Sequence, residues 1–156
     1  MISQRLEELG IRLPSVAAPV ASYVPAVKVG NQVWTSGQLP FVEGELPATG
    51  KVDHGHGAGN VSAAEAQKLA GTAVLNALAA VDALVGIDKV TRVLKIVGFV
   101  ASAPDFDGQP GVVNGASNLI GEIFGAAGAH ARSAVGVAEL PLNSPVEIEL
   151  IVEVAE

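Results

Sequence analysis

Arg132 and Glu147 are the two charged residues of this sequence whose positions could support chemistry. Arg132 stands at the start of an apolar strand pattern over residues 134–137, and Glu147 lies inside a second strand pattern over 146–154. A guanidinium grips a carboxylate in two-point fashion and stays charged, whereas a carboxylate can orient a water molecule or accept its proton. Together they suit a small carboxylic acid whose neighbouring carbon is attacked by water. A purely structural ion pair between the two residues is an equally open interpretation.

The composition limits the classes of protein that these residues could serve. The chain has 156 residues, which is typical of a single domain over 1–156, and it has no cysteine, which excludes disulfides and thiolate metal sites. The net charge of −7 repels phosphate backbones, and the nine Lys and Arg residues form no run, so a nucleic-acid partner is not expected. The apolar share of 49% is high for a soluble monomer, so we expect surface to be buried between subunits.

Residues 1–16 predict an N-terminal extension that carries a short amphipathic helix over 3–9, with Ser3 as its cap and Gly10 as its end. Charged residues interrupt any signal-type apolar core in this extension. The sequence also has no run of 18 uncharged apolar residues, so no transmembrane helix is expected. We therefore expect a cytoplasmic protein without a membrane partner.

The remaining elements predict an α+β domain with two helices on one face of a mixed sheet. Gly30-Asn31 joins two strand-like runs, 24–29 and 32–36, as a two-residue hairpin turn. A glycine after such a strand, here Gly37, can let backbone groups approach a ligand, although a simple strand exit is the alternative. Later elements follow as a helix over 62–84 opened by the capping box Ser62–Glu65, a strand over 90–101, a helix over 110–124 and the two strands named above.

Three details of these elements are expectations that a structure can test. The strand over 90–101 is apolar on both sides, with Val93 grouped with Lys95 on one side and Ile96 on the other, which favours a central strand covered on both faces. Asn76 and Asp82 interrupt the apolar pattern of the first long helix, and we expect each to be exposed or to act as a cap.

The loop over 41–61 contains Asp53-His54-Gly55-His56, which raises the possibility of a metal site. A closed site needs three or four ligands with supporting neighbours, and nothing else nearby supplies them. A solvated glycine-rich loop is the favoured interpretation. No glycine motif of a phosphate-binding loop opens a helix in this chain.

Two separated motifs resemble those of the RidA (YjgF) reactive-intermediate deaminase family. Residues 132–141, Arg-Ser-Ala-Val-Gly-Val-Ala-Glu-Leu-Pro, with Val-Glu-Ile-Glu at 146–149, resemble the C-terminal signature of the family. Gly30-Asn31 with Thr-Ser-Gly-Gln-Leu-Pro at 35–40 resembles its N-terminal signature. Asn114 is similar to the helix asparagine of the family and Tyr23 to its arm tyrosine. The resemblance extends over residues 17–154.

The resemblance implies a chorismate-mutase-like fold with a six-stranded mixed sheet, two helices on one face, and a homotrimer whose sheets close into a central barrel. Active sites would lie in the clefts between subunits, without a metal or organic cofactor. The implied reaction is hydrolysis of a 2-imino acid, or its enamine tautomer, to a 2-keto acid and ammonia. Arg132 would bind the substrate carboxylate and Glu147 would position the water. The other implied site residues are Tyr23, Ser36, Asn114 and, through their backbone, Gly37 and Ala134.

Some features depart from the family pattern and keep other functions open. Ala134 stands where many members have cysteine, so a thiol role is excluded but a backbone contact is not. The N-terminal helix and the long loop over 41–61 indicate a divergent subgroup. One alternative is a non-catalytic module that binds small carboxylates or protects the cell through the same cleft. Another is RNA cleavage, against which the acidic composition counts.

Overall fold

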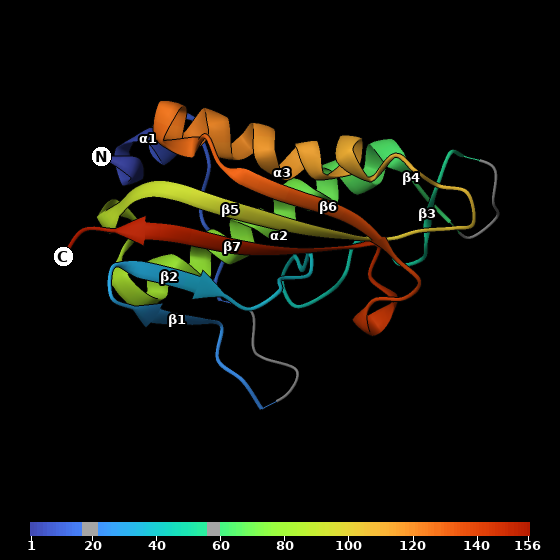
Figure 1. Cartoon of the computed structure of the whole chain (residues 1–156), viewed down its shortest axis with the longest axis horizontal. Helices are drawn as coiled ribbons and strands as arrows, with labels where there is room; N and C mark the ends of the chain where they lie inside the picture. Colours follow the sequence, from blue (N-terminus) through green and yellow to red (C-terminus); the bar gives the residue numbers. More distant parts are fainter. Residues whose placement is uncertain (17–21, 56–59) are drawn as a thin grey trace.

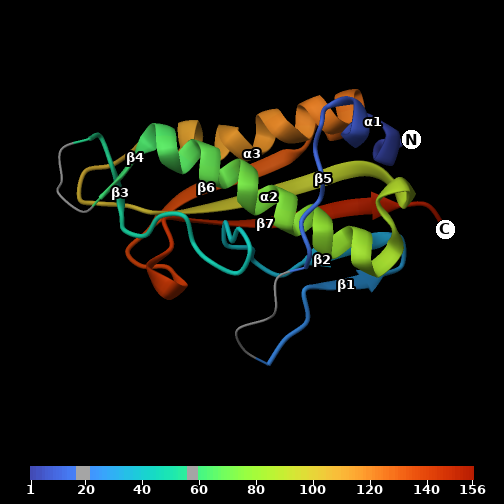
Figure 2. The same cartoon turned by 180° about the vertical axis from the view of Figure 1, so that it is seen from behind.

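The main sheet has five strands and carries its two long helices on one face (Figures 1 and 2). The computed structural model describes residues 1–16, 22–55 and 60–156. In spatial order the strands are β1 (Ala26–Val29), β2 (Gln32–Thr35), β7 (Val146–Val154), β5 (Val90–Ala101) and β6 (Ala131–Val137). The long helices are α2 (Ala63–Val85) and α3 (Gln109–Phe124). The α+β prediction with two helices on one face of a mixed sheet is confirmed.

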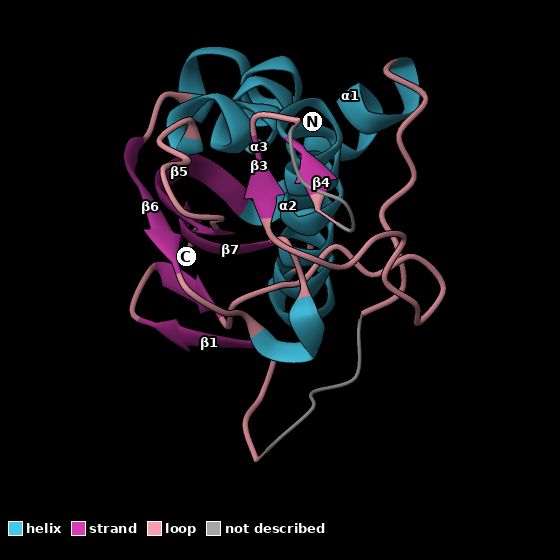
Figure 3. Cartoon of the chain, turned by 90° about the vertical axis from the view of Figure 1, so that its right-hand side faces the viewer, coloured by secondary structure: helices cyan, strands magenta, loops and turns pink. Residues whose placement is uncertain are grey.

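The implied count of six strands differs from what the described residues form. Two further strands, β3 (Val52–Asp53) and β4 (Val61–Ser62), pair with each other in a separate parallel sheet (Figure 3). Their link to the main sheet is a single bridge from Val52 to Ser102, just beyond β5. Strands of two residues are too short to extend a ladder, so the main sheet stays at five.

The alternation along β7 separates the two faces of the sheet. Every second residue from Val146 to Val154 is buried under the helices, and the residues between are half-buried on the opposite face. This opposite face, which we call the open face, carries Glu147, Glu149 and Glu153. The prediction that the apolar side of this strand packs on the helices is confirmed.

One assignment of sides on β5 is wrong. The pairing with β7 shifts register between Val93 and Lys95, so the two residues do not share a face as a regular two-residue period requires. Val93 is fully buried on the helix side, as Ile96 is. Lys95, Val97 and Phe99 are half-buried on the open face. β5 is central, as predicted, but only one of its faces is covered by helices within the chain.

The turns and caps follow the predicted pattern for most elements. Val29 pairs with Gln32 across the two-residue turn, with Gly30 at φ +58°. Ser62 caps α2 by accepting a hydrogen bond from the backbone N–H of Glu65 at 3.1 Å. α2 ends at Gly86 and α3 at Gly125, as glycine stops predict.

The first helix begins earlier than expected, and Ser3 is not its cap. Helix α1 spans Ile2–Glu8 with Met1 before it, so Ser3 lies inside the first turn. Ser3 instead donates from its backbone N and its Oγ to the two carboxylate oxygens of Asp88, at 2.8 and 2.6 Å. These hydrogen bonds, the side-chain one first, lower the pKa of Asp88. Arg5 Nε donates to the carbonyl of Glu122 on α3 at 3.0 Å, so α1 is anchored at two points.

The two polar residues within α2 have different roles. Asn76 is only 2% exposed, and its side-chain amide donates to the carbonyls of Leu39 and Phe41 at 3.0 and 3.1 Å. The expectation that Asn76 is exposed or acts as a cap is therefore wrong, because it holds the loop after β2 against the helix. Asp82 does act at the helix end, where its carboxylate accepts from the N–H of Ile87 at 2.8 Å.

Among the described residues, α2 is the one helix that is long and apolar enough to cross a bilayer. Most of its apolar residues are instead buried against the sheet and α3. The sequence predicted this helix but did not indicate a membrane span, because Glu65, Lys68 and Asp82 interrupt its apolar run.

The crossing of α2 and α3 depends on small residues. A Cβ at Gly115 of α3 would overlap the backbone carbonyl of Gln67 on α2, and one at Gly71 of α2 would lie 3.3 Å from the carbonyl of Gly115. The backbones therefore approach each other so closely that a methyl group does not fit at Gly115. This close packing sets the distance between α3 and α2, and with it the position of Asn114 on α3.

We expect Gly115→Ala to lower the free energy of unfolding by about 1–3 kcal/mol, the usual range for forcing extra volume into packed backbone. Gly121→Ala in the same helix is the matched control, because a Cβ there meets no atom within 4 Å. That control should raise stability by up to about 1 kcal/mol, since alanine is the better helix former. Urea unfolding of both variants measures the difference, and equal effects would contradict the close crossing.

Candidate functional site

Arg132 lies on the helix side of the sheet, inside β6. It is in register with Ile96, which is fully buried beneath the helices. Its Nη1 donates to Asn114 Oδ1 at 2.7 Å and to Ser117 Oγ at 3.3 Å, and its Nη2 donates to the carbonyl of Pro110 at 3.4 Å. All three acceptors belong to α3, so the arginine and the predicted Asn114 are brought together.

Ser117 and His130 were not assigned a role from the sequence. His130 Nε2 lies 2.9 Å from Ser117 Oγ, and its Nδ1 lies 2.6 Å from the carbonyl of Gly128. The sequence did contain a signal for Ser117, because residues three apart on a helix share a face and Asn114 had been singled out. His130 has no such signal, since only the fold places its ring beside α3.

Glu147 lies on the open face, with its carboxylate directly against Gly37. A side chain on Gly37 would overlap the carboxylate of Glu147, so only glycine leaves room for it there. The backbone exchanges two hydrogen bonds between Gln38 and Ile148, at 2.8 and 3.0 Å, and Thr35 Oγ1 accepts from the N–H of Leu150 at 3.0 Å. A local irregularity between β2 and β7 thereby places Gly37 over Glu147.

Ser36 connects this region to the arm before β1. Its Oγ donates to the carbonyl of Val24 at 2.6 Å, and its N–H donates to the carbonyl of Pro25 at 2.8 Å. Tyr23 precedes Val24 and is 44% exposed. The described chain therefore brings Tyr23, Ser36, Gly37 and Glu147 into one region of the sheet.

Burial and like charge act on the carboxylates of the open face. Burial first, and the neighbouring Glu149 second, raise the pKa of Glu147. Burial also raises the pKa of Glu149, while the ammonium of Lys95 opposes that shift. Glu147 is thus a carboxylate that holds a proton more readily than an ordinary one, which suits a group that accepts a proton from water.

Arg132 and Glu147 do not meet within one chain. Their side chains lie on opposite faces of the sheet, on strands separated by β5, so about two strand spacings of 4.8 Å lie between the strands alone. Ion pairs of the described residues do not include Arg132. The interpretation as an intramolecular ion pair is therefore wrong. Ala134 lies on the helix side with Arg132, two residues further along β6.

The open face exposes apolar side chains beside its carboxylates. Val27, Val29 and Trp34 on the hairpin are 48, 69 and 49% exposed, and Val135 on β6 is 44% exposed. The register places these four residues on the same side as Glu147. Such a face on a sheet is typical of a surface that packs against another molecule.

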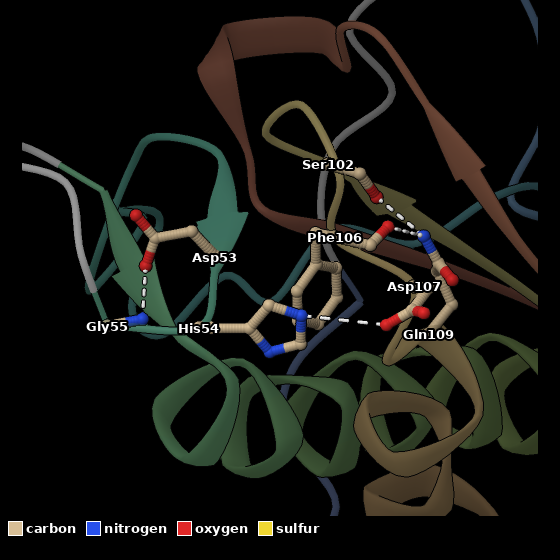
Figure 4. Close-up of polar contacts among 7 residues, drawn as sticks. All are labelled: Asp53, His54, Gly55, Ser102, Phe106, Asp107 and Gln109. Carbon is tan, nitrogen blue, oxygen red and sulfur yellow. Dashed lines mark hydrogen bonds and ion pairs between the residues drawn. The ribbon is translucent and has the colours of Figure 1, made fainter.

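Asp53 and His54, which raised the possibility of a metal site, have other contacts (Figure 4). His54 lies 3.5 Å from the carboxylate of Asp107, and its ring centroid is 4.9 Å from that of Phe106. Asp53 accepts hydrogen bonds from the N–H of Gly55 and the amide of Asn60, at 2.7 and 2.8 Å. His56 lies outside the described residues. Within the described part of the chain these contacts organise the loop, and no three His, Asp or Glu residues gather there as a metal site would require.

A cleft of about 900 Å³ lies away from all of the predicted site residues. Its walls come from three segments, namely the N-terminal extension at 12–16, the turn at 41–44 and the middle of α2, together with Leu142. The predicted site residues instead form two separate groups at the sheet, one around Arg132 and one around Glu147.

Comparisons with known proteins bear on what these two groups do. A family model described as "YjgF/chorismate_mutase-like, putative endoribonuclease" matches residues 3–154. Protein TCP17 of Trypanosoma cruzi is 40% identical over 97% of this chain and 93% of its own length. A 2-iminobutanoate/2-iminopropanoate deaminase of Dermatophagoides farinae is 35% identical over 91% and 93%. A crystal structure of a "putative endoribonuclease" from Shewanella oneidensis has a TM-score of 0.90 and 32% identity, covering 99% of both chains.

The raised pKa of Glu147 predicts a pH-dependent stability difference. A carboxylate whose pKa is higher in the folded than in the unfolded state favours the folded state while it is protonated. This contribution is complete below the pKa of the unfolded state, near 4.3, and it is lost as the pH rises through the pKa of the folded state. Glu147→Gln removes the buried charge and the repulsion from Glu149, so it should melt at a higher temperature than wild type at neutral pH, with the gap closing below about pH 4.

Thermal melts across this pH range measure the effect, and Glu153→Gln on the same strand and face is the control with little change expected. A variant that melts at or below the wild-type temperature at neutral pH would mean that burial does not govern the charge of Glu147.

Proposed function

This chain belongs to the YjgF/chorismate mutase-like family, and on that premise we propose that it hydrolyses reactive 2-imino acids, or their enamine tautomers, to 2-keto acids and ammonia. The active sites of the proposed enzyme lie in clefts between the subunits of a homotrimer. The similarity to an imine deaminase over 91% of the chain supports this activity. The presence of both Arg132 and Glu147 supports it further, because the reaction needs a carboxylate binder and a group that handles water.

The observation that carries the proposal is the separation of Arg132 and Glu147 onto opposite faces of one sheet. A small substrate cannot touch both side chains of a single chain. It can do so if the edge strand β6 of one subunit lies beside the Glu147 region of another. The exposed Val27, Trp34 and Val135 favour such packing, since burial of their side chains would stabilise the association.

Arg132 has donors free for the substrate in this arrangement. Both N–H groups of Nη1 are directed to Asn114 and Ser117, and one N–H of Nη2 to Pro110. Nε and the second N–H of Nη2 donate to no acceptor among the described residues, so they remain for a carboxylate, which they can bind at two points. Asn114 thereby acts on the substrate through the arginine as well as lining the cleft.

Hydrolysis then follows from a water held by Glu147. The carboxylate accepts a proton from the water as the water oxygen bonds to the imine carbon, and it passes this proton on to the imine nitrogen. The tetrahedral carbinolamine that results collapses to the keto group and releases ammonia. Backbone groups at Gly37 and Ala134 hold the reacting part, and Tyr23 and Ser36 line the cleft. The side chains named here perform the reaction without a metal or organic cofactor.

RNA cleavage and carboxylate binding without catalysis are the two alternatives to this function. The family description and the Shewanella relative carry the word endoribonuclease. The net charge of −7 and the carboxylates of the open face oppose binding of a phosphate backbone. A non-catalytic carboxylate-binding module would bind keto acids without accelerating the release of ammonia.

Arg132→Ala should abolish imine hydrolysis and leave the oligomer intact, because its acceptors are neutral and remain satisfied by water. The assay follows ammonia release from a 2-imino acid generated in situ, with light scattering for the oligomer. Arg12→Ala, an exposed arginine of the N-terminal extension, is the control that should keep full activity. Full activity of Arg132→Ala would overturn the assignment.

Glu147→Gln should lower kcat by roughly 100-fold or more while a 2-keto acid still binds, since the amide cannot accept the proton of water but leaves Arg132 in place. Turnover is measured as above, and binding of pyruvate by calorimetry. Glu153→Gln should preserve both quantities. Wild-type kcat in Glu147→Gln would remove this residue from the mechanism.

A further inference from the structure

A chain of hydrogen bonds runs from the backbone to the guanidinium of Arg132, and its directions are set by chemistry. The carbonyl of Gly128 can only accept, so His130 Nδ1 carries the proton that it donates at 2.6 Å. In the neutral ring Nε2 is then an acceptor, and Ser117 Oγ–H donates to it at 2.9 Å. The lone pairs of Ser117 Oγ are thereby left for the N–H of Arg132 Nη1 at 3.3 Å.

The carbonyl of Gly128, at which this relay of hydrogen bonds begins, lies in a tightly packed turn. Gly128 is buried, and a Cβ there would lie 2.8 Å from the carbonyl oxygen of Ile120 on α3. The turn that carries Gly128 is therefore packed tightly against the helix that carries Ser117. Gly128 and Ser117 therefore belong to one tightly packed unit, so the hydroxyl of Ser117 has a defined position relative to the carbonyl that begins the relay.

The partners of Arg132 suggest that it is held for a ligand. An arginine with a structural role commonly lies beside a carboxylate that offsets its charge. Arg132 is bound by three uncharged oxygens, those of Asn114, Ser117 and Pro110, and the described residues form no ion pair with it. Its positive charge is consequently oriented but not compensated.

We propose that Ser117 and His130 are positioning residues that orient the guanidinium of Arg132, so that its free N–H groups face the carboxylate of the substrate. This inference rests on the proposed function of Arg132. Neither residue touches the substrate, and both act on its affinity. A flexible arginine would have to be ordered each time a substrate binds, whereas a tethered one is ordered beforehand.

Substitutions that break the relay should affect affinity more than turnover. Ser117→Ala removes the hydroxyl, and His130→Leu removes the ring nitrogen that accepts from it. With an imine generated in situ, each variant should raise KM about tenfold and change kcat less than about twofold. Ser117→Thr keeps the hydroxyl, and His130→Gln keeps one donor and one acceptor, so both should restore KM to near the wild-type value. His54→Leu, the same change at a histidine that contacts Phe106 and Asp107 instead, should leave KM unchanged.

A second measurement keeps this inference separate from the proposed function. Rotation of the Arg132 guanidinium about its Cζ–Nη1 bond, followed by NMR of labelled arginine, should be faster in Ser117→Ala and His130→Leu than in wild type. If wild type hydrolyses no imine, the proposed function fails, and the NMR result alone decides whether the relay orients Arg132. Unchanged rotation in both variants, unchanged KM, or an equal rise of KM in His54→Leu would overturn the proposal.

Discussion

The two-residue period of β7 is the constraint on which the rest of this structure depends. Ile148 and Leu150 are fully buried under the helices, so Glu147 and Glu149 must point to the open face. A slip of one residue would turn Glu147, Glu149 and Glu153 towards the core, and burial of three carboxylates is far too costly to occur. The position of Glu147 is therefore determined by the same burial that holds the helices on the sheet.

This alternation also explains why one chain does not contain a complete site. β6 runs parallel to β5, and Arg132 falls in register with the buried Ile96, so the guanidinium is directed to α3. Glu147 is directed the other way and is penalised by partial burial and by Glu149. An uncompensated cation on one side and an unfavourably placed carboxylate on the other are costs to the single chain. Association that brought the two together around a substrate carboxylate would offset both.

Small residues make the geometry of both half-sites possible. Gly37 leaves room for the carboxylate of Glu147, and Gly115 lets α3 approach α2 closely enough to place Asn114 above β6. A methyl group at Gly37 would collide with the Glu147 carboxylate itself, whereas one at Gly115 would collide with the backbone of Gln67 and so displace Asn114 indirectly. The glycine content of the chain thus contributes to the sites as well as to the turns.

The sequence by itself determined the order and type of the elements of the main sheet and its helices, because periodicity and caps are local. It did not predict the short strands β3 and β4, where a loop was expected. The period of β7, the capping box at Ser62 and the turn at Gly30-Asn31 were all recognisable. Family motifs led to Arg132, Asn114 and Glu147 as candidates. Only the tertiary structure decided the bulge that moved Val93, the burial of Asn76 and the role of Ser3. Only the tertiary structure revealed that Arg132 and Glu147 lie on opposite faces, because the face of a residue on β6 depends on the register of β6 with β5. The positions of the α3 residues that bind Arg132 depend in turn on how the two long helices cross.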